Sequence, residues 1–97
     1  MKAVVLGGTS GMGRAIARRL AERGDAVFLL GTPEADVARS AEDLKARHPR
    51  GEAAGYAHLD LEQPETFAPA LDAAEAALGG FDAVIVTAAL FATQDVL

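Results

Sequence analysis

A glycine-rich segment between two apolar patterns constrains the fold of this chain more than any other feature. Gly7, Gly11 and Gly13 follow the apolar run at residues 2–6, which predicts a strand. An amphipathic helical pattern begins at Met12. A strand that turns through glycines into a helix leaves the first helical N–H groups unpaired, at the positive end of the helix dipole. The segment therefore predicts an anion-binding loop, and the alternative is a tight turn that holds no ligand.

The rest of the chain alternates between apolar runs and helical patterns. Runs at 26–30 and 82–87 predict two further strands, and a weaker run at 53–59 predicts another. A repeated strand–helix–strand order predicts an α/β fold with a doubly wound parallel sheet of about four strands and helices on both faces. The length of 97 residues and the unbroken alternation indicate one domain, residues 1–97.

The first predicted helix carries Met12, Ile16 and Leu20 at four-residue spacing, which indicates that they face the sheet, and Gly24 marks its end. Its arginines are interpreted as a solvated surface.

A second helix is predicted to start with Thr32 as N-cap and Pro33 in the first helical position, and to end near residues 48–49. A third is expected from Pro64 to residues 79–80. The expected inward residues of the second helix are Val37, Ala41 and Leu44, and the apolar positions of the third are Phe67, Leu71, Ala74 and Leu78.

Composition excludes several classes of protein. The formal net charge of -5 argues against a nucleic-acid binder, which needs a basic face. The chain has no cysteine, so disulfides and thiolate chemistry are excluded. No apolar run approaches the roughly 20 residues of a membrane span, and the first residues do not resemble a signal peptide. We therefore expect a cytoplasmic protein that binds neither nucleic acid nor membrane.

The segment from Val5 to Arg14 resembles the cofactor motif of the short-chain dehydrogenases/reductases, T-G-x-x-x-G-[aliphatic]-G, with Leu6 in the place of the threonine. The family binds NAD(P) on a Rossmann fold, and the resemblance implies the same here. The glycine spacing is G-x-x-x-G-x-G, unlike the G-x-x-G-x-x-G of the nucleotide-sugar branch. The implied roles are a tight turn at Gly7, backbone approach to phosphates at Gly11, and close helix packing at Gly13.

Two later segments also resemble the family. His58-Leu59-Asp60-Leu61 matches the position where the family places an aspartate that hydrogen-bonds adenine. The alternative for Asp60 is a cap or first-turn acid of the following helix. The fourth strand ends Val86-Thr87-Ala88-Ala89 where the family has N-N-A-G, so only Ala88 matches. The resemblance assigns cofactor contacts to Gly7, Thr9, Ser10, Gly11, Met12, Gly13, Thr32, Asp60, Leu61, Thr87, Ala88 and Ala89.

The end of the second strand normally selects between the two nicotinamide cofactors. An acid there binds the ribose of NAD, and a basic residue binds the 2′-phosphate of NADP. Here the residues are Gly31 and Thr32, with Ser10 in the loop. Thr32 suits either ribose form or, alternatively, caps the helix. Because a repelling acid is missing from this position, we expect NADP in slight preference to NAD.

The family's catalytic residues have no counterpart in these 97 residues. A Tyr acts as acid and base, a Lys in Y-x-x-x-K lowers its pKa, and a Ser orients the substrate oxygen. The only tyrosine is Tyr56, followed four residues later by Asp60, and the only lysines are Lys2 and Lys45. His48 and His58 lack metal-ligand spacing. We therefore assign no catalytic and no metal-binding residue.

Two functions remain open. The first is the cofactor-binding half of an oxidoreductase that moves hydride between nicotinamide and a carbonyl or alcohol substrate, with the small-molecule substrate bound only by a longer parent protein. The second is a short, non-catalytic nucleotide-binding or interaction module. The fourth strand is expected beside the first, with its other edge open, and an open apolar edge favours self-association. A third possibility is a Rossmann-shaped relic without a ligand.

Overall fold

The computed structural model describes residues 2–7, 11–47, 53–60 and 62–86. The elements follow in the order β1 (Lys2–Leu6), α1 (Gly11–Glu22), β2 (Ala26–Gly31), α2 (Glu34–Arg47), β3 (Ala53–His58), a 3-10 turn (Pro64–Thr66), α3 (Phe67–Leu78) and β4 (Ala83–Val86). The predicted order of strands and helices is confirmed, including the weak third strand.

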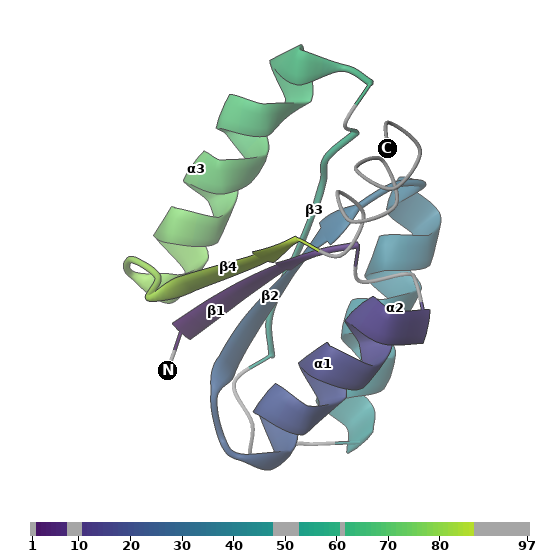
Figure 1. Cartoon of the computed structure of the whole chain (residues 1–97), viewed down its shortest axis with the longest axis vertical. Coiled ribbons are helices and arrows are strands. Elements are labelled where there is room, and N and C mark those ends of the chain that lie inside the picture. Colours follow the sequence, from purple (N-terminus) through teal and green to yellow (C-terminus); the bar gives the residue numbers. More distant parts are fainter. Residues whose placement is uncertain (1, 8–10, 48–52, 61, 87–97) are drawn as a thin grey trace, which may run out of the picture.

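The described residues form a four-stranded parallel sheet in the order β3-β2-β1-β4. Figure 1 shows α1 and α2 on one face of the sheet and α3 on the other. The chain crosses from β1 to β2 to β3 in one direction, then returns through α3 to β4 beside β1. This is the doubly wound, Rossmann-type α/β fold that the sequence predicts.

The two central strands are buried on both faces, which explains their unbroken apolar sequences. Their alternating residues divide between two clusters. Val5 and Leu29 pack with α1 and α2, and Val4 and Leu30 pack with α3. The sheet is thus the middle layer between two helical layers, which holds the strand ends in fixed register.

The side of α1 that faces the sheet agrees with the prediction at Leu20 and, partly buried, at Ile16, but not at Met12. Its buried residues are Gly13, Ala17, Leu20 and Ala21, whereas Met12 is 51% exposed. The expectation that Met12 faces the core was therefore wrong. The sheet-facing side consists mostly of small residues, because a helix that packs closely against a sheet has little room there.

The strand β3 contains an irregularity that explains its weak sequence signal. Its register with β2 shifts between Val27 and Phe28, and Gly55 has φ of 125°, a backbone conformation that residues with a Cβ rarely adopt. A Cβ on Gly55 would lie 3.5 Å from the Phe28 ring. The glycine lets the bulge form while the ring covers it.

Candidate cofactor-binding site

The carboxyl ends of β1, β2 and β3 are joined into one edge by backbone hydrogen bonds. The Gly7 N–H donates to the Leu30 carbonyl at 2.9 Å, and the Leu59 N–H donates to the Gly31 carbonyl at 3.0 Å. Gly7 has φ of 93°, so the chain turns off β1 in a conformation that favours glycine. Ligands of open α/β sheets bind at this edge, where the strand order reverses. In this sheet the reversal lies between β1 and β4, because β2 and β3 follow on one side of β1 and β4 lies on the other.

The helix α1 starts at this edge and presents its N-terminus without a neutralising acid. Gly11 is its first residue, and the first turn contains no acidic side chain. Among the described residues, no atom lies within 4 Å of a Cβ built on Gly11, so they leave room beside the first residue of the helix. An open helix N-terminus of this kind suits an anionic group such as a pyrophosphate.

The end of β2 leads into α2 one residue later than predicted. The Val37 N–H donates to the Pro33 carbonyl at 3.2 Å, which makes Pro33 the N-cap residue and Glu34 the first helical residue. The N-cap assignment of Thr32 was therefore wrong. Thr32 is exposed beside the carboxyl end of β2, where a ribose contact stays a prediction.

The first turn of α2 carries two acids, Glu34 and Asp36, which the prediction from residues 31–32 did not consider. Asp36 pairs with Arg39, with 3.6 Å between its Oδ1 and the arginine Nη2. The charge at the start of α2 is thus set by this helical turn as well as by the end of β2.

Asp60 follows β3 and anchors a turn. Its Oδ1 accepts the Glu62 N–H at 2.9 Å, and its own N–H donates to Thr66 Oγ1 at 2.9 Å. The Thr66 hydroxyl donates to the Gln63 carbonyl at 2.8 Å. Since α3 begins only at Phe67, Asp60 caps this turn and is not a cap or first-turn acid of the helix. The contact of Thr66 with Asp60 is one that the sequence interpretation missed.

The strand β4 brings a fourth carboxyl end to the same edge, because Val86 is in register with Leu6. The ends of β1 and β4 therefore lie next to each other at this edge. Half of the predicted contact residues lie outside the described residues: Thr9, Ser10, Leu61, Thr87, Ala88 and Ala89.

A cavity of about 380 Å³ lies elsewhere, between α1 and α2, and none of its lining residues belongs to the predicted cofactor contacts. Within the described residues, no group of three or more His, Asp or Glu side chains is placed to hold a metal ion. The helices of the described part are all too short or too polar to cross a membrane.

Known proteins with similar sequences and structures share this architecture. Residues 1–97 match the family model described as short chain dehydrogenase. The chain is 37% identical to cis-4-hydroxycyclohexanecarboxylate dehydrogenase of Sinomonas cyclohexanicum over 89 residues. This alignment covers 91% of this chain and 34% of that protein.

Two solved structures superpose on the chain. The alcohol dehydrogenase of Thermococcus sibiricus, complexed with 5-hydroxy-NADP, has a TM-score of 0.75 and 28% identity over 86% of this chain and 34% of its own. The 3-ketoacyl-(acyl-carrier-protein) reductase of Brucella melitensis, complexed with NADH, has a TM-score of 0.73 and 26% identity over 86% of this chain and 32% of its own.

The chain thus spans about a third of the length of these relatives. The family match covers every residue, and the glycine turn, the strand order and the strand-end geometry agree with it. This chain belongs to the short-chain dehydrogenase family.

Proposed function

We propose that this chain is the NAD(P)-binding part of a short-chain oxidoreductase that moves hydride between nicotinamide and a carbonyl or alcohol carbon. The observation that carries the proposal is the turn from β1 into α1. Gly7 turns the chain at positive φ, and Gly11 starts a helix whose first turn has no acid, with no other described atom within 4 Å of a Cβ built on it. This is the arrangement that pyrophosphate binding needs.

The residues present fit a dinucleotide in extended form along the carboxyl edge. The pyrophosphate would lie before Gly11 and accept N–H bonds from the first turn of α1. The ribose would lie near Thr32, and the adenine amino group near Asp60. Asp60 is suited to this because Thr66 and the turn at 60–63 fix its backbone, while Glu62 occupies only Oδ1. The bound cofactor would supply or accept the hydride.

For the cofactor itself, we propose NADP in slight preference to NAD. In support, the strand end has no acid at Gly31 or Thr32 that would repel a 2′-phosphate. Glu34 in the next helical turn weakens this argument, because an exposed carboxylate near the ribose favours NAD. One relative is complexed with an NADP derivative and another with NADH.

Catalysis itself is assigned to a longer protein. Tyr56, the only tyrosine, is on β3 and half-exposed, and no lysine follows it at the family's spacing. We therefore propose that the chain binds cofactor alone, without turnover, and that substrate binding and proton transfer require further residues. Its proposed location is the cytoplasm, which cell fractionation would test, with recovery in the membrane pellet as the contrary result.

The direct experiment is a fluorescence titration of the folded protein with NADPH and with NADH, with circular dichroism to verify folding. The proposal predicts saturable binding of both, with NADPH bound more tightly. Saturable binding of neither cofactor by a folded sample would refute it and favour the interaction module.

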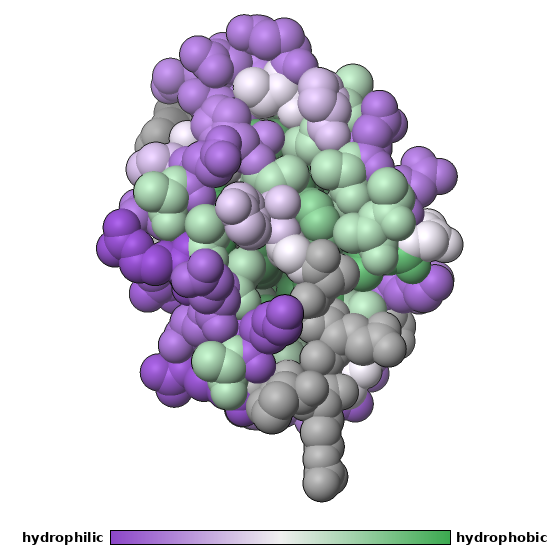
Figure 2. All heavy atoms as spheres, turned by 180° about the vertical axis from the view of Figure 1, so that it is seen from behind, coloured by the Kyte–Doolittle hydropathy of each residue, from purple (hydrophilic) through white to green (hydrophobic). Residues whose placement is uncertain are grey.

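A second candidate function, self-association, rests on a separate observation at the sheet edge. The described sheet ends at β4, whose only described strand neighbour is β1, and Val84 is 46% exposed. Figure 2 shows the face seen from behind, where apolar residues lie between hydrophilic margins, and it does not mark β4. Unpaired strand edges of this type pair with other chains. Sedimentation velocity should show dimers or larger species as concentration rises, and a monomer at high concentration would contradict the expectation.

A further inference from the structure

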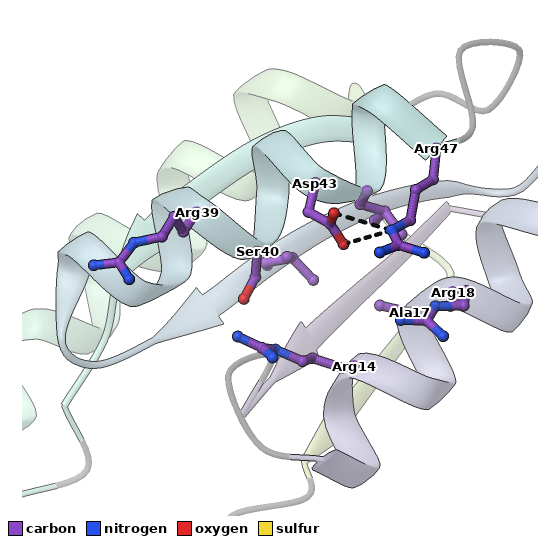
Figure 3. Close-up of a pocket in the computed structure, with 9 residues that line it drawn as sticks. Arg14, Ala17, Arg18, Arg39, Ser40, Asp43 and Arg47 are labelled. Atoms are coloured by element: carbon purple, nitrogen blue, oxygen red, sulfur yellow. Dashed lines mark hydrogen bonds and ion pairs between the residues drawn. The ribbon is translucent and has the colours of Figure 1, made fainter.

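The cavity of about 380 Å³ between α1 and α2 is rich in arginine. Figure 3 shows Arg14 and Arg18 on α1 facing the side of α2 that carries Ser40, Asp43 and Arg47, with Arg39 further along α2. Leu29 of β2 is among the lining residues, so the cavity reaches inward to the sheet. Its complete lining is Arg14, Ala17, Arg18, Leu29, Arg39, Ser40, Asp43, Leu44 and Arg47.

The charges that line the cavity do not balance. Asp43 is the only acid in the lining, and it is bound to Arg47, whose Nε lies 2.9 and 3.0 Å from the two carboxylate oxygens. Arg39 pairs with Asp36 outside the lining. Among the described residues, Arg14 and Arg18 have no ion pair. A chain with a net charge of -5 therefore carries a local excess of positive charge here.

A buried hydroxyl in the same place lacks a partner. Ser40 is 8% exposed, and its Oγ is buried without a hydrogen bond. Figure 3 shows this oxygen directed into the gap between the helices, toward Arg14. A buried hydroxyl without a partner is destabilising, and in native proteins most such groups bind protein, water or a ligand.

The lowered pKa of Asp43 is consistent with the positive charge around it. The hydrogen bond from Arg47 holds the pKa of the Asp43 carboxyl below its usual value, and the charges of Arg18 and Arg14 act in the same direction from across the cavity. Both α1 arginines are thus close enough to be felt by an anion on α2.

We propose that the α1–α2 cavity binds a phosphorylated small molecule, with Arg14, Arg18 and the Ser40 hydroxyl as donors to its phosphate oxygens. Guanidinium groups bind phosphate in a bidentate manner, and a serine hydroxyl adds a donor that an isolated arginine surface lacks. The volume is in the range of small-molecule sites, which span roughly 300–1,000 Å³. The site shares no residue with the proposed cofactor contacts, so this proposal does not depend on cofactor binding.

The test is a titration with inorganic pyrophosphate, followed by amide NMR, in the presence and absence of saturating NADPH. The matched variants are Arg18→Gln, which removes a lining arginine, and Arg19→Gln, which removes an exposed arginine of the same helix outside the cavity. We expect pyrophosphate to shift the amides of Ser40 and Leu44 in both conditions. Arg18→Gln should weaken binding about tenfold, the loss of a charge-assisted hydrogen bond, and Arg19→Gln should leave it unchanged.

Ser40→Ala is a second variant that keeps the helix, since alanine is the best helix former. It should weaken pyrophosphate binding about threefold while the thermal midpoint is kept or raised, because the unpartnered hydroxyl is removed.

The proposal is overturned by any of three results. The first is that pyrophosphate leaves the Ser40 and Leu44 amides unshifted, and the second is that it binds Arg18→Gln and Arg19→Gln equally well. The third is that NADPH abolishes the Ser40 and Leu44 shifts, which would assign the phosphate to the cofactor site.

Discussion

The two ends of the sheet use their polar groups differently. At the amino end, they bind one another. The Lys2 N–H donates to Asp82 Oδ2 at 2.9 Å, and the Asp82 N–H donates back to the Lys2 carbonyl at 2.8 Å. Arg23 pairs with Asp25 at 3.5 Å just before β2. These contacts fasten the starts of neighbouring strands to each other and to the helix ends.

At the carboxyl end of the sheet, the described polar groups do not link neighbouring strands through side chains. A Cβ on Gly11, the first residue of α1, would touch none of the described residues, and Thr32 is exposed after β2. The polar contacts of Asp60 are with its own turn, which holds the loop without closing the edge. The amino end of the sheet, called the closed end below, thus stabilises the fold through its polar contacts. The carboxyl end, called the open end, is suited to a ligand. Substitutions at the two ends should therefore separate stability from cofactor binding.

The largest effect is expected from Gly11→Ala at the open end. The added Cβ meets nothing within 4 Å, so the fold should be retained. It would occupy the space through which phosphates approach, and NADPH affinity should fall by about tenfold or more, ~1.4 kcal/mol. Fluorescence titration measures the affinity, and thermal unfolding verifies the fold. Unchanged affinity would remove Gly11 from the site.

The matched change at the closed end is Gly79→Ala. Gly79 ends α3 with φ of 70°, and its N–H donates to the Glu75 carbonyl at 2.8 Å. A Cβ is strained in this left-handed conformation, so the free energy of unfolding should fall by about 1 kcal/mol. Urea unfolding measures the loss. NADPH affinity should not change, and a parallel loss of affinity would mean that the two ends are not separable.

A smaller contrast is expected between Asp60→Ala and Asp82→Ala. Both carboxylates accept one backbone N–H, from Glu62 and Lys2 respectively. Each change should lower stability by about 0.5–1 kcal/mol. Only Asp60→Ala should also weaken NADPH binding, by about threefold to tenfold, because it removes the proposed adenine acceptor. Equal affinities of the two variants for NADPH would contradict the assignment of Asp60.

The smallest expected effect is the pH dependence of stability that arises from the last turn of α2. This turn lies at the closed end. Arg47 hydrogen-bonds Asp43 and lowers its pKa below the usual carboxyl value. The pair therefore stabilises the fold above the unfolded-state pKa, and this contribution is lost as pH falls through the lowered folded-state pKa. In Arg47→Gln, carboxyl NMR titration should show the Asp43 pKa moving up. An unmoved pKa would show that Arg47 is not its principal partner.

The sequence predicted the central features because they follow from local chemistry. The strands β1 and β2 are apolar throughout since both faces are buried, and Gly7 marks the turn that only a positive φ allows. On α1 the expected sheet-facing residue Leu20 is buried, Met12 is not, and the buried Ala17 and Ala21 were not predicted. Small residues carry little hydrophobic signal even where they form the contact.

Features that join distant segments could not be predicted in this way. The Thr66 hydroxyl fixes Asp60 across six residues through a turn whose geometry the sequence does not specify. The α1 arginines were expected on a solvated surface, and Arg14 and Arg18 are exposed. Their spacing within one helix could not show that they face Ser40 of α2, since that depends on how the two helices pack.

The central claim is that the carboxyl end of the sheet binds a nicotinamide dinucleotide and the amino end does not. The most direct test is to follow backbone amide NMR signals of the folded protein during titration with NADPH. The account predicts saturable shifts at Gly7, Gly11 and Asp60, with the amides of Gly24, Gly79 and Asp82 unmoved. Shifts concentrated at Gly24, Gly79 and Asp82, with the carboxyl end unaffected, would contradict it.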